Sequence, residues 1–233
     1  MEFQGKKALV FGGTSGIGRA TVAKLCDAGA NVVAISRDPS KAEDMDGVSL
    51  AGCDVRDTEA LAALFAEQAP FDLLISAATG GDRAVGPFLN MDLDGYRASF
   101  DKLWGYANCV HLGAAHLTDD GCIVLVSGSP ARRAKPGQSA LASVGGAVEQ
   151  FVRAVAVEIA PRRINVVSPG VIATPMFGPA TDERDAMLAK STQGHLIGRP
   201  GTPEEVAEGI MFVAGNDFVT GTTIDVDGGW LLS

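Results

Sequence analysis

Short apolar runs alternate along the chain with longer segments in which apolar residues recur every three to four positions. The short runs predict β-strands and the longer periodic segments predict helices. The expected strands cover residues 7–12, 31–36, 48–53, 71–77, 122–127, 164–168 and 222–226. The expected helices cover residues 16–28, 58–68, 94–117, 138–160 and 203–214, with a short one near 182–190. Nearly continuous apolar strands separated by helices are typical of a parallel sheet that is covered on both faces.

This alternation predicts an α/β fold: a single Rossmann-type, doubly wound parallel sheet of about seven strands, with helices on both faces. No linker, repeat or low-complexity segment interrupts the pattern, so we expect one dinucleotide-binding domain over residues 1–233. The stretch 171–201 is broken by proline and glycine and carries apolar residues such as Met176 and Phe177. We expect this stretch to form a lid over the substrate side.

A glycine-rich turn, Gly12-Gly-Thr-Ser-Gly16-Ile-Gly18, connects the first expected strand to the first expected helix. Glycine lacks the Cβ atom that would obstruct a phosphate, and the N–H groups and dipole of the following helix attract negative charge. Because it stands between a strand and a helix, this turn indicates a dinucleotide site.

Composition and charge narrow the possible partners. The chain has 233 residues, is 46% hydrophobic and carries a formal net charge of −9, which disfavours general binding to nucleic acid. No apolar run reaches the ~18 residues of a membrane helix, and the first strand begins too early to leave room for a signal peptide. The four cysteines lack metal-ligand spacing. We therefore expect a cytoplasmic protein with no metal site and no nucleic-acid or membrane partner.

The order of motifs resembles the short-chain dehydrogenase/reductase family over essentially the whole chain. The glycine turn matches that family's Gly-x-x-x-Gly-x-Gly spacing, and Asp54-Val55 matches its adenine-binding Asp-Val. Residues 156–170 are similar to the segment around its sixth strand, and Thr174 falls on its nicotinamide-contacting threonine. The C-terminal Ile224-Asp-Val-Asp-Gly-Gly229 matches its last strand and turn.

The resemblance also implies which residues contact a cofactor. They are Gly12, Thr14, Ser15, Gly16, Ile17, Gly18, Ser36, Arg37, Asp54, Val55, Ala77, Pro169, Gly170, Val171 and Thr174. Ser36-Arg37 offers a hydroxyl and a guanidinium to a 2′-phosphate, which favours NADP(H), whereas an acid at this point would hold the ribose hydroxyls of NAD. The alternative is a surface arginine paired with Asp38.

The positions that carry the family's catalytic residues hold other residues here. On the helix after the fifth expected strand, Leu141 falls on the family's tyrosine and Gly145 on its lysine. The family's serine falls on Gly128, and its helix asparagine falls on Lys102. Leucine and glycine donate no proton, so another group supplies it, or the chemistry differs, or there is none.

Several residues are candidates for the missing role. Lys102 is one, because an ammonium donates a proton or polarises a carbonyl; the alternative is a solvated helix lysine. Ser127 or Ser129 is expected to hydrogen-bond a substrate oxygen, unless both only form the turn after the strand. His195 either serves as a proton donor or is solvated in its loop. Arg132, Arg133 and Lys135 either face an anionic substrate or form a solvated charged run.

These observations predict an NADP(H)-dependent oxidoreductase of the short-chain type that interconverts a carbonyl and an alcohol with a replaced proton donor. The alternatives are a catalytically inactive NADP(H)-binding or sensory protein and a non-redox enzyme on the same fold. We expect a small-molecule substrate. We also expect a homo-oligomer, with four copies favoured, because the helices at 94–117 and 138–160 carry broad apolar surface and their counterparts in the family pack across a two-fold axis.

Overall fold

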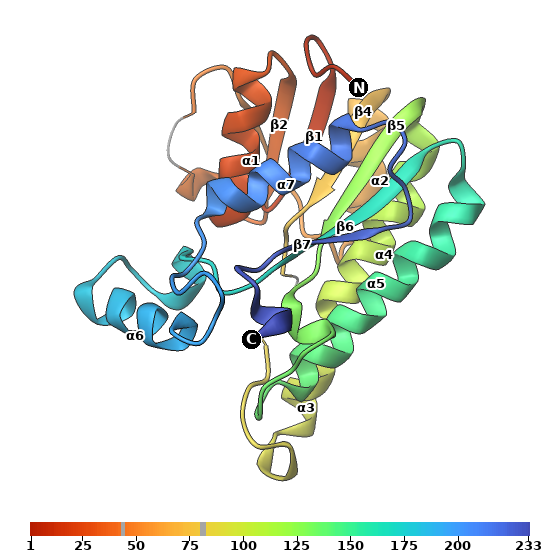
Figure 1. The fold of residues 1–233 in the computed structure, drawn as a ribbon. Coiled ribbons are helices and arrows are strands. Elements are labelled where there is room, and N and C mark those ends of the chain that lie inside the picture. Colours follow the sequence, from red (N-terminus) through yellow and green to blue (C-terminus); the bar gives the residue numbers. More distant parts are fainter. Residues whose placement is uncertain (43–44, 80–82) are drawn as a thin grey trace.

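A parallel, seven-stranded sheet forms the centre of the molecule, in the order β3-β2-β1-β4-β5-β6-β7 (Figure 1). The computed structural model describes residues 1–42, 45–79 and 83–233. The strands are β1 (Lys7–Phe11), β2 (Asn31–Ser36), β3 (Ser49–Gly52), β4 (Phe71–Ser76), β5 (Leu117–Val126), β6 (Arg163–Pro169) and β7 (Thr223–Val226). The expected α/β fold is confirmed, and the carboxyl ends of the strands share one edge of the sheet.

Helices cover both faces of this sheet, as expected. The helices are α1 (Gly16–Asp27), α2 (Thr58–Gln68), α3 (Leu93–Ala98), α4 (Asp101–Gly113), α5 (Ser139–Ile159), α6 (Asp182–Thr192) and α7 (Pro203–Gly215), of which α3 and α6 lie beyond the carboxyl edge of the sheet (Figure 1). Side chains of α2, α4 and α5 join one apolar core, while α1 and α7 contribute to the other. The helix expected near residues 182–190 is confirmed as α6.

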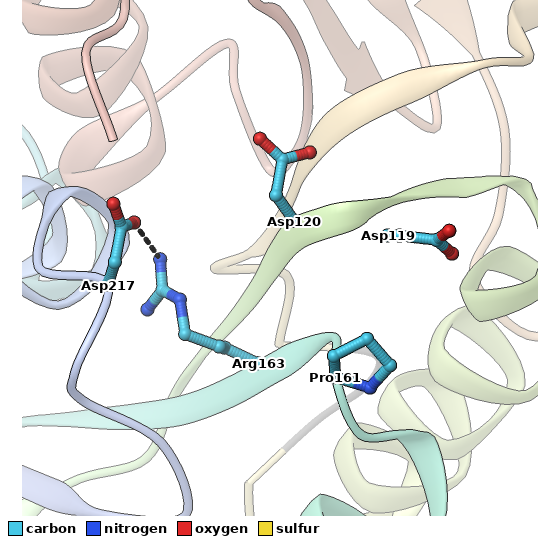
Figure 2. Close-up of a pocket in the computed structure, with 5 residues that line it drawn as sticks. All are labelled: Asp119, Asp120, Pro161, Arg163 and Asp217. Atoms are coloured by element: carbon cyan, nitrogen blue, oxygen red, sulfur yellow. Dashed lines mark ion pairs between the residues drawn. The ribbon is translucent and has the colours of Figure 1, made fainter.

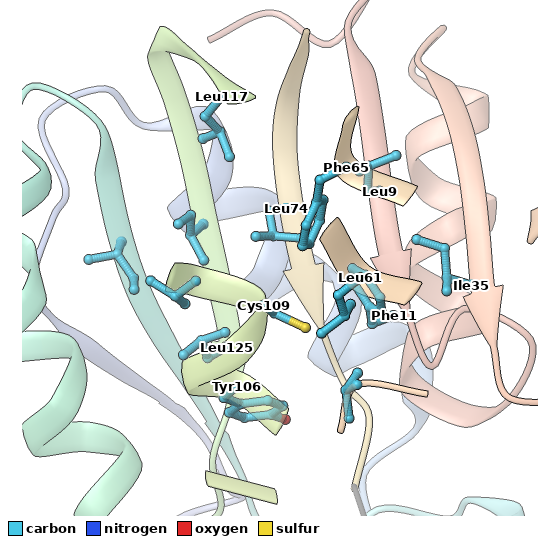
Figure 3. Packing of buried hydrophobic residues seen from close by; sticks show 14 of the residues in the cluster. Leu9, Phe11, Ile35, Leu61, Phe65, Leu74, Tyr106, Cys109, Leu117 and Leu125 are labelled. Carbon is cyan, nitrogen blue, oxygen red and sulfur yellow. The ribbon is translucent and has the colours of Figure 1, made fainter. Parts of the chain in front are cut away.

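Alternate residues of each strand enter opposite cores, because successive side chains of a strand point to opposite faces. Leu9 and Phe11 of β1 belong to the core under α2, α4 and α5. Figure 3 shows this core, with Phe65 beside Phe11. The Phe65 ring contacts the rings of Phe11 and Phe71, with centroid distances of 5.8 and 5.7 Å. Both faces of the sheet are therefore apolar, which explains the nearly continuous hydrophobic strands.

The single helix expected over 94–117 is wrong. The chain instead forms α3, a break at Ser99 and Phe100, and then α4. At this break the Ser99 hydroxyl donates a hydrogen bond to the Gly95 carbonyl and accepts one from the Ala84 N–H, both at 2.9 Å. The break therefore binds the segment that precedes α3. After a short 3-10 turn, β5 begins at Leu117 rather than at 122, because its polar first residues hide the strand from an apolar pattern.

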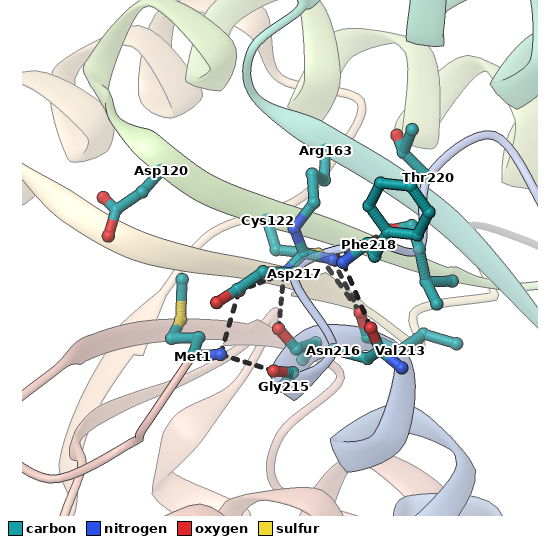
Figure 4. Close-up of polar contacts among 12 residues, drawn as sticks. Met1, Asp120, Cys122, Arg163, Val213, Gly215, Asn216, Asp217, Phe218 and Thr220 are labelled. Carbon is teal, nitrogen blue, oxygen red and sulfur yellow. Dashed lines mark hydrogen bonds and ion pairs between the residues drawn. The ribbon is translucent and has the colours of Figure 1, made fainter.

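The amino edge of the sheet is held by Arg163, the first residue of β6 (Figure 4). Its buried guanidinium donates to the carbonyls of Val213 and Val219 at 2.8 and 2.9 Å, and also to the Ala214 carbonyl. A positive group at the carboxyl end of a helix satisfies carbonyls that have no partner within the helix and complements the helix dipole. Arg163 therefore anchors the end of α7 to the sheet.

Candidate functional site

The glycine turn lies at the carboxyl end of β1 and requires its glycines. Gly12 and Gly16 have φ angles of +76° and +49°, which other residues rarely adopt. A Cβ atom on Gly18 would lie 2.0 Å from the Gly12 carbonyl oxygen, so no side chain fits there. The turn therefore brings the start of α1 directly against the end of β1.

The amino terminus of α1 has the features of an anion-binding site. Ser15 occupies the N-cap, but its side chain makes no capping hydrogen bond, and the first turn of the helix contains no acidic residue. Unpaired N–H groups and the positive end of the helix dipole attract a phosphate at such a position. The residues present thus fit the pyrophosphate of a dinucleotide.

Other cofactor residues expected from the sequence meet this turn. A Cβ on Gly12 would lie 3.1 Å from the Ala77 carbonyl carbon, and one on Gly16 would lie 3.5 Å from the Thr174 side chain. The Gly170 N–H donates to the Val226 carbonyl at 3.0 Å, which fixes the segment that leaves β6. The structure therefore places the ends of β1, β4 and β6 around one site.

Arg37 and Asp54 follow β2 and β3, farther along the same edge. The Asp54 carboxylate accepts hydrogen bonds from the Arg56 side chain at 2.9 and 3.2 Å, and these bonds hold its pKa below the ordinary value, with a smaller contribution from Arg37. Arg37 itself is exposed, so its guanidinium is accessible at this edge of the sheet. The Ser36 hydroxyl oxygen is buried and unpartnered, which leaves Arg37 as the exposed group here.

Two residues that support this edge escaped the sequence analysis. The Asn108 side chain donates to the Val55 carbonyl at 3.1 Å. A Cβ on Gly105 would lie 2.4 Å from the Val55 side chain, so α4 approaches closely because residue 105 is glycine. Neither contact has a local sequence signal, since both join segments that are distant in the chain.

Gly145, which we expected from the sequence to fall on the family's lysine, has no room for a side chain. Gly145 is buried, and a Cβ on it would lie only 2.8 Å from the Ala131 Cβ atom. The 3-10 turn Ser129–Ala131 packs against α5 at this point, and the Ser127 hydroxyl donates to the Gly145 carbonyl at 3.2 Å. Leu141 lies one turn earlier on α5 and carries no polar group. Neither position supplies a proton.

Lys102 of α4 is directed toward the carboxyl end of β5. Its Nζ donates to the Ser127 carbonyl at 3.2 Å and lies 5.6 Å from the centre of the Tyr106 ring. The side chain is half-buried, which contradicts the alternative of a solvated helix lysine. Desolvation lowers the pKa of Lys102 to about 8, with a smaller contribution from the Arg83 charge. An ammonium with this pKa donates a proton readily near neutral pH.

The two serine candidates are not equivalent. Ser129 is fully buried and donates its hydroxyl to the Pro169 carbonyl at 3.1 Å, so the expectation that it orients a substrate oxygen does not fit this geometry. This hydrogen bond joins the turn after β5 to the last residue of β6. The two residues are distant in the chain, so the sequence pattern does not predict the contact. Ser127 is also largely buried, but its backbone carbonyl is the group that holds Lys102.

His195 is not solvated, contrary to the alternative that we considered. It is 8% exposed and contacts Trp230 in a tilted arrangement, with ring centroids 5.1 Å apart. Burial lowers its pKa, and the Lys135 charge lowers it further. The charged run expected after β5 is also not free: Lys135 Nζ lies 4.5 Å from the centre of the Trp230 ring, and Arg132 pairs with Asp225. These residues join the C-terminal turn to the rest of the protein.

A hollow of about 380 Å³ lies at the opposite, amino edge of the sheet (Figure 2). It is lined by Asp119, Asp120, Pro161, Arg163 and Asp217. Arg163 is already committed to α7, and none of the expected cofactor residues lines the hollow. We therefore assign the functional site to the carboxyl edge.

Neither a metal cluster nor a membrane span is found in the described parts of the chain. No group of three or more histidine, cysteine or acidic residues there is arranged to hold a metal ion. Among the same residues, no helix combines the length and apolar character needed to span a bilayer.

Comparison with known proteins gives consistent matches over the whole chain. A family model described as Enoyl-(Acyl carrier protein) reductase matches residues 12–231. L-xylulose reductase from Mus musculus is 32% identical over 240 residues, which cover 97% of each chain. A small-chain dehydrogenase crystallised in complex with NADPH has a TM-score of 0.84 and 29% identity, covering 99% of this chain and 100% of its own. A solved short chain dehydrogenase/reductase family protein has a TM-score of 0.87 and 30% identity, covering 100% of both chains.

The glycine turn, the strand order and these matches agree with one another. The chain belongs to the short-chain dehydrogenase/reductase family of oxidoreductases.

Proposed function

We propose that the protein is an NADP(H)-dependent reductase or dehydrogenase in which Lys102 replaces the family's tyrosine as proton donor. The observation that carries this proposal is the half-buried ammonium of Lys102 at the Ser127 carbonyl, close to the closed Gly145 position. When bound, NADPH supplies a hydride to a carbonyl carbon. The protein must then supply a proton to the carbonyl oxygen, and Lys102 is the group placed to do so.

The proposal is tested by following NADPH oxidation with a panel of aldehydes and ketones. Replacing Lys102 with methionine should lower turnover by ~10²–10⁴-fold and leave cofactor affinity nearly unchanged. Lys24 pairs with Glu208 on the α1–α7 side of the sheet, so Lys24→Met is the matched control. Unchanged turnover in Lys102→Met would remove Lys102 from the mechanism.

The preference for NADP(H) rests on Arg37. Its exposed guanidinium follows β2 and offers charge-assisted bonds to a 2′-phosphate. We expect NADPH to bind more tightly than NADH by ~1–3 kcal/mol. Titration of both cofactors against wild type, Arg37→Ala and the surface control Arg97→Ala tests this, and equal affinities in the wild type would contradict it. The solved relative that contains NADPH supports the same choice.

A second function is favoured by one observation: Leu141 and Gly145 supply no proton donor. A protein that binds NADP(H) without turnover would have this site. Tight cofactor binding, combined with no oxidation or reduction by any carbonyl or alcohol, would favour that function.

We further propose that copies of the chain associate through α4 and α5, with a tetramer as the expected assembly. Trp104 of α4 is 58% exposed and Val157 of α5 is 81% exposed, so both helices offer apolar side chains to a second copy. Light scattering tests this proposal. A mass of 24.0 kDa at micromolar concentration, which is that of one chain, would contradict it.

Residues 171–201, which include α6, are proposed as the lid over the substrate side. Met176, Met187 and Phe177 are 49%, 48% and 39% exposed, so they are available to enclose an apolar part of a ligand. Hydrogen exchange in this stretch should slow when cofactor and ligand bind together. Equal protection with and without them would exclude a lid.

A further inference from the structure

Arg83 lies in the segment before α3 and carries an exposed guanidinium. Within the described residues it has neither a hydrogen bond nor an ion pair, whereas Arg56, Arg132 and Arg133 contact carboxylates or a carbonyl. Acidic residues outnumber basic ones in this chain, which has a net charge of −9, so partners were available in principle. An unpaired guanidinium leaves five N–H donors for a ligand.

The structure holds the backbone next to Arg83 in place beside the proposed site. The N–H of Ala84 donates to the Ser99 hydroxyl at 2.9 Å, at the junction between α3 and α4. The N–H of Gly86 donates to the Gly137 carbonyl at 2.9 Å, just before α5. Lys102 lies three residues after Ser99, in the first turn of α4. The segment that carries Arg83 is therefore attached near the starts of both α4 and α5.

Arg83 and Lys102 bring two positive charges to the start of α4, on either side of the Ala84–Ser99 hydrogen bond in the chain. They are close enough that the Arg83 charge disfavours the protonated form of Lys102. The carboxylate of Asp101, next to Lys102 in the chain, pairs with Arg56 at 3.0 Å. Two like charges in a partly desolvated site repel each other, and a bound anion relieves that repulsion.

We propose that Arg83 binds a carboxylate of the substrate while Lys102 faces its reacting oxygen, so that the substrate is a short oxo acid or the corresponding hydroxy acid. A guanidinium matches a carboxylate with two parallel N–H···O bonds, which also fixes the orientation of the ligand. Hydride reaches the carbonyl carbon, the Lys102 proton reaches the oxygen, and the carboxylate is unchanged. This inference rests on the proposed function, but its binding part is measured separately.

Binding is measured by calorimetry on the protein saturated with NADPH. The probes are oxamate and malonamate, which carry a carboxylate beside an amide carbonyl that is not reduced, and their uncharged methyl esters. We expect at least one acid to bind about 10- to 100-fold more tightly than its ester. This preference should disappear in Arg83→Gln, be partly kept in Arg83→Lys and be unchanged in Arg97→Gln, which alters the net charge equally on the α3 surface. Equal binding of acid and ester, absence of binding, or an unaffected Arg83→Gln would each overturn the inference.

Turnover separates this inference from the proposed function. NADPH oxidation is followed with 2-oxobutanoate, 3-oxobutanoate and their methyl esters. If acids and esters react equally well, the reductase stands and the role of Arg83 fails. If the acids bind through Arg83 but none of the compounds reacts, the anion site stands and the reductase fails. If acids react faster and Arg83→Gln removes the advantage, both stand.

Discussion

Two adjacent glycines in α5, Gly145 and Gly146, allow a direct test of why the family's lysine position is closed. Replacing an interior helix glycine with alanine gains about 1 kcal/mol from helix propensity. At Gly146 the new Cβ would meet only the Ala131 carbonyl oxygen at 3.9 Å, an ordinary contact. Gly146→Ala should therefore stabilise the protein by about 0.5–1 kcal/mol.

At Gly145 the same substitution meets an obstacle. The new Cβ would lie 2.8 Å from the Ala131 Cβ and 3.3 Å from its Cα, and neither atom moves by rotating a side chain. Overpacking of this kind costs about 1–3 kcal/mol, which offsets or exceeds the propensity gain. We expect Gly145→Ala to be less stable than Gly146→Ala by about 1–3 kcal/mol, or about 2–12 °C in Tm.

Urea and thermal unfolding of both variants at equal protein concentration provide the measurement. Ala131→Gly supplies the control, because removing the opposing Cβ should relieve part of the cost of Gly145→Ala, which a double-mutant cycle detects. If Gly145→Ala matches Gly146→Ala in stability, α5 and the turn before it are not tightly packed, and the lysine position is open after all.

Three further predictions concern ionisable groups. The rate of carbonyl reduction should fall as pH rises through about 8, where Lys102 loses its proton, and Lys102→Met should abolish that limb of the pH–rate profile. Because burial lowers the pKa of His195 in the folded state, the unfolded chain binds that proton more tightly; the free energy of unfolding should therefore decrease as pH falls through 6.5, and His195→Gln should flatten the decrease. Arg163→Met should destabilise the protein by about 2–4 kcal/mol in chemical unfolding because buried carbonyls of α7 lose their donors, and a loss below about 0.5 kcal/mol would show that water replaces the guanidinium.

The sequence predicted the sheet well because both of its faces are buried, so that strands such as β4 are apolar throughout. It predicted the glycine turn because the backbone geometry demands glycine at Gly12 and Gly16. It missed the break between α3 and α4, since that break depends on a hydrogen bond from Ala84 to Ser99. Local pattern carries no information about such a contact.

In the candidate site, too, the sequence predicts which residues are present but not the contacts that distant segments make with them. That Leu141 falls on the family's tyrosine is an expectation from the sequence resemblance, whereas the lack of space at Gly145 depends on where the turn at Ala131 lies. The sequence suggested Lys102, whereas its desolvation and the nearby Arg83 charge come from the packing of α4. Contacts between distant segments decide which polar residues remain available for chemistry.

The pairing of β1 with β4 has a consequence for how the protein assembles. β1 is synthesised early, yet it has β2 on one side and β4 on the other, and Thr174 reaches the glycine turn only after β6 has joined the sheet. During translation the glycine turn is therefore made before Thr174, and the nucleotide site is complete only when β6 has joined the sheet. A ligand that contacts both parts binds the finished sheet and not a nascent or truncated chain, so cofactor supply acts on the folded population by mass action.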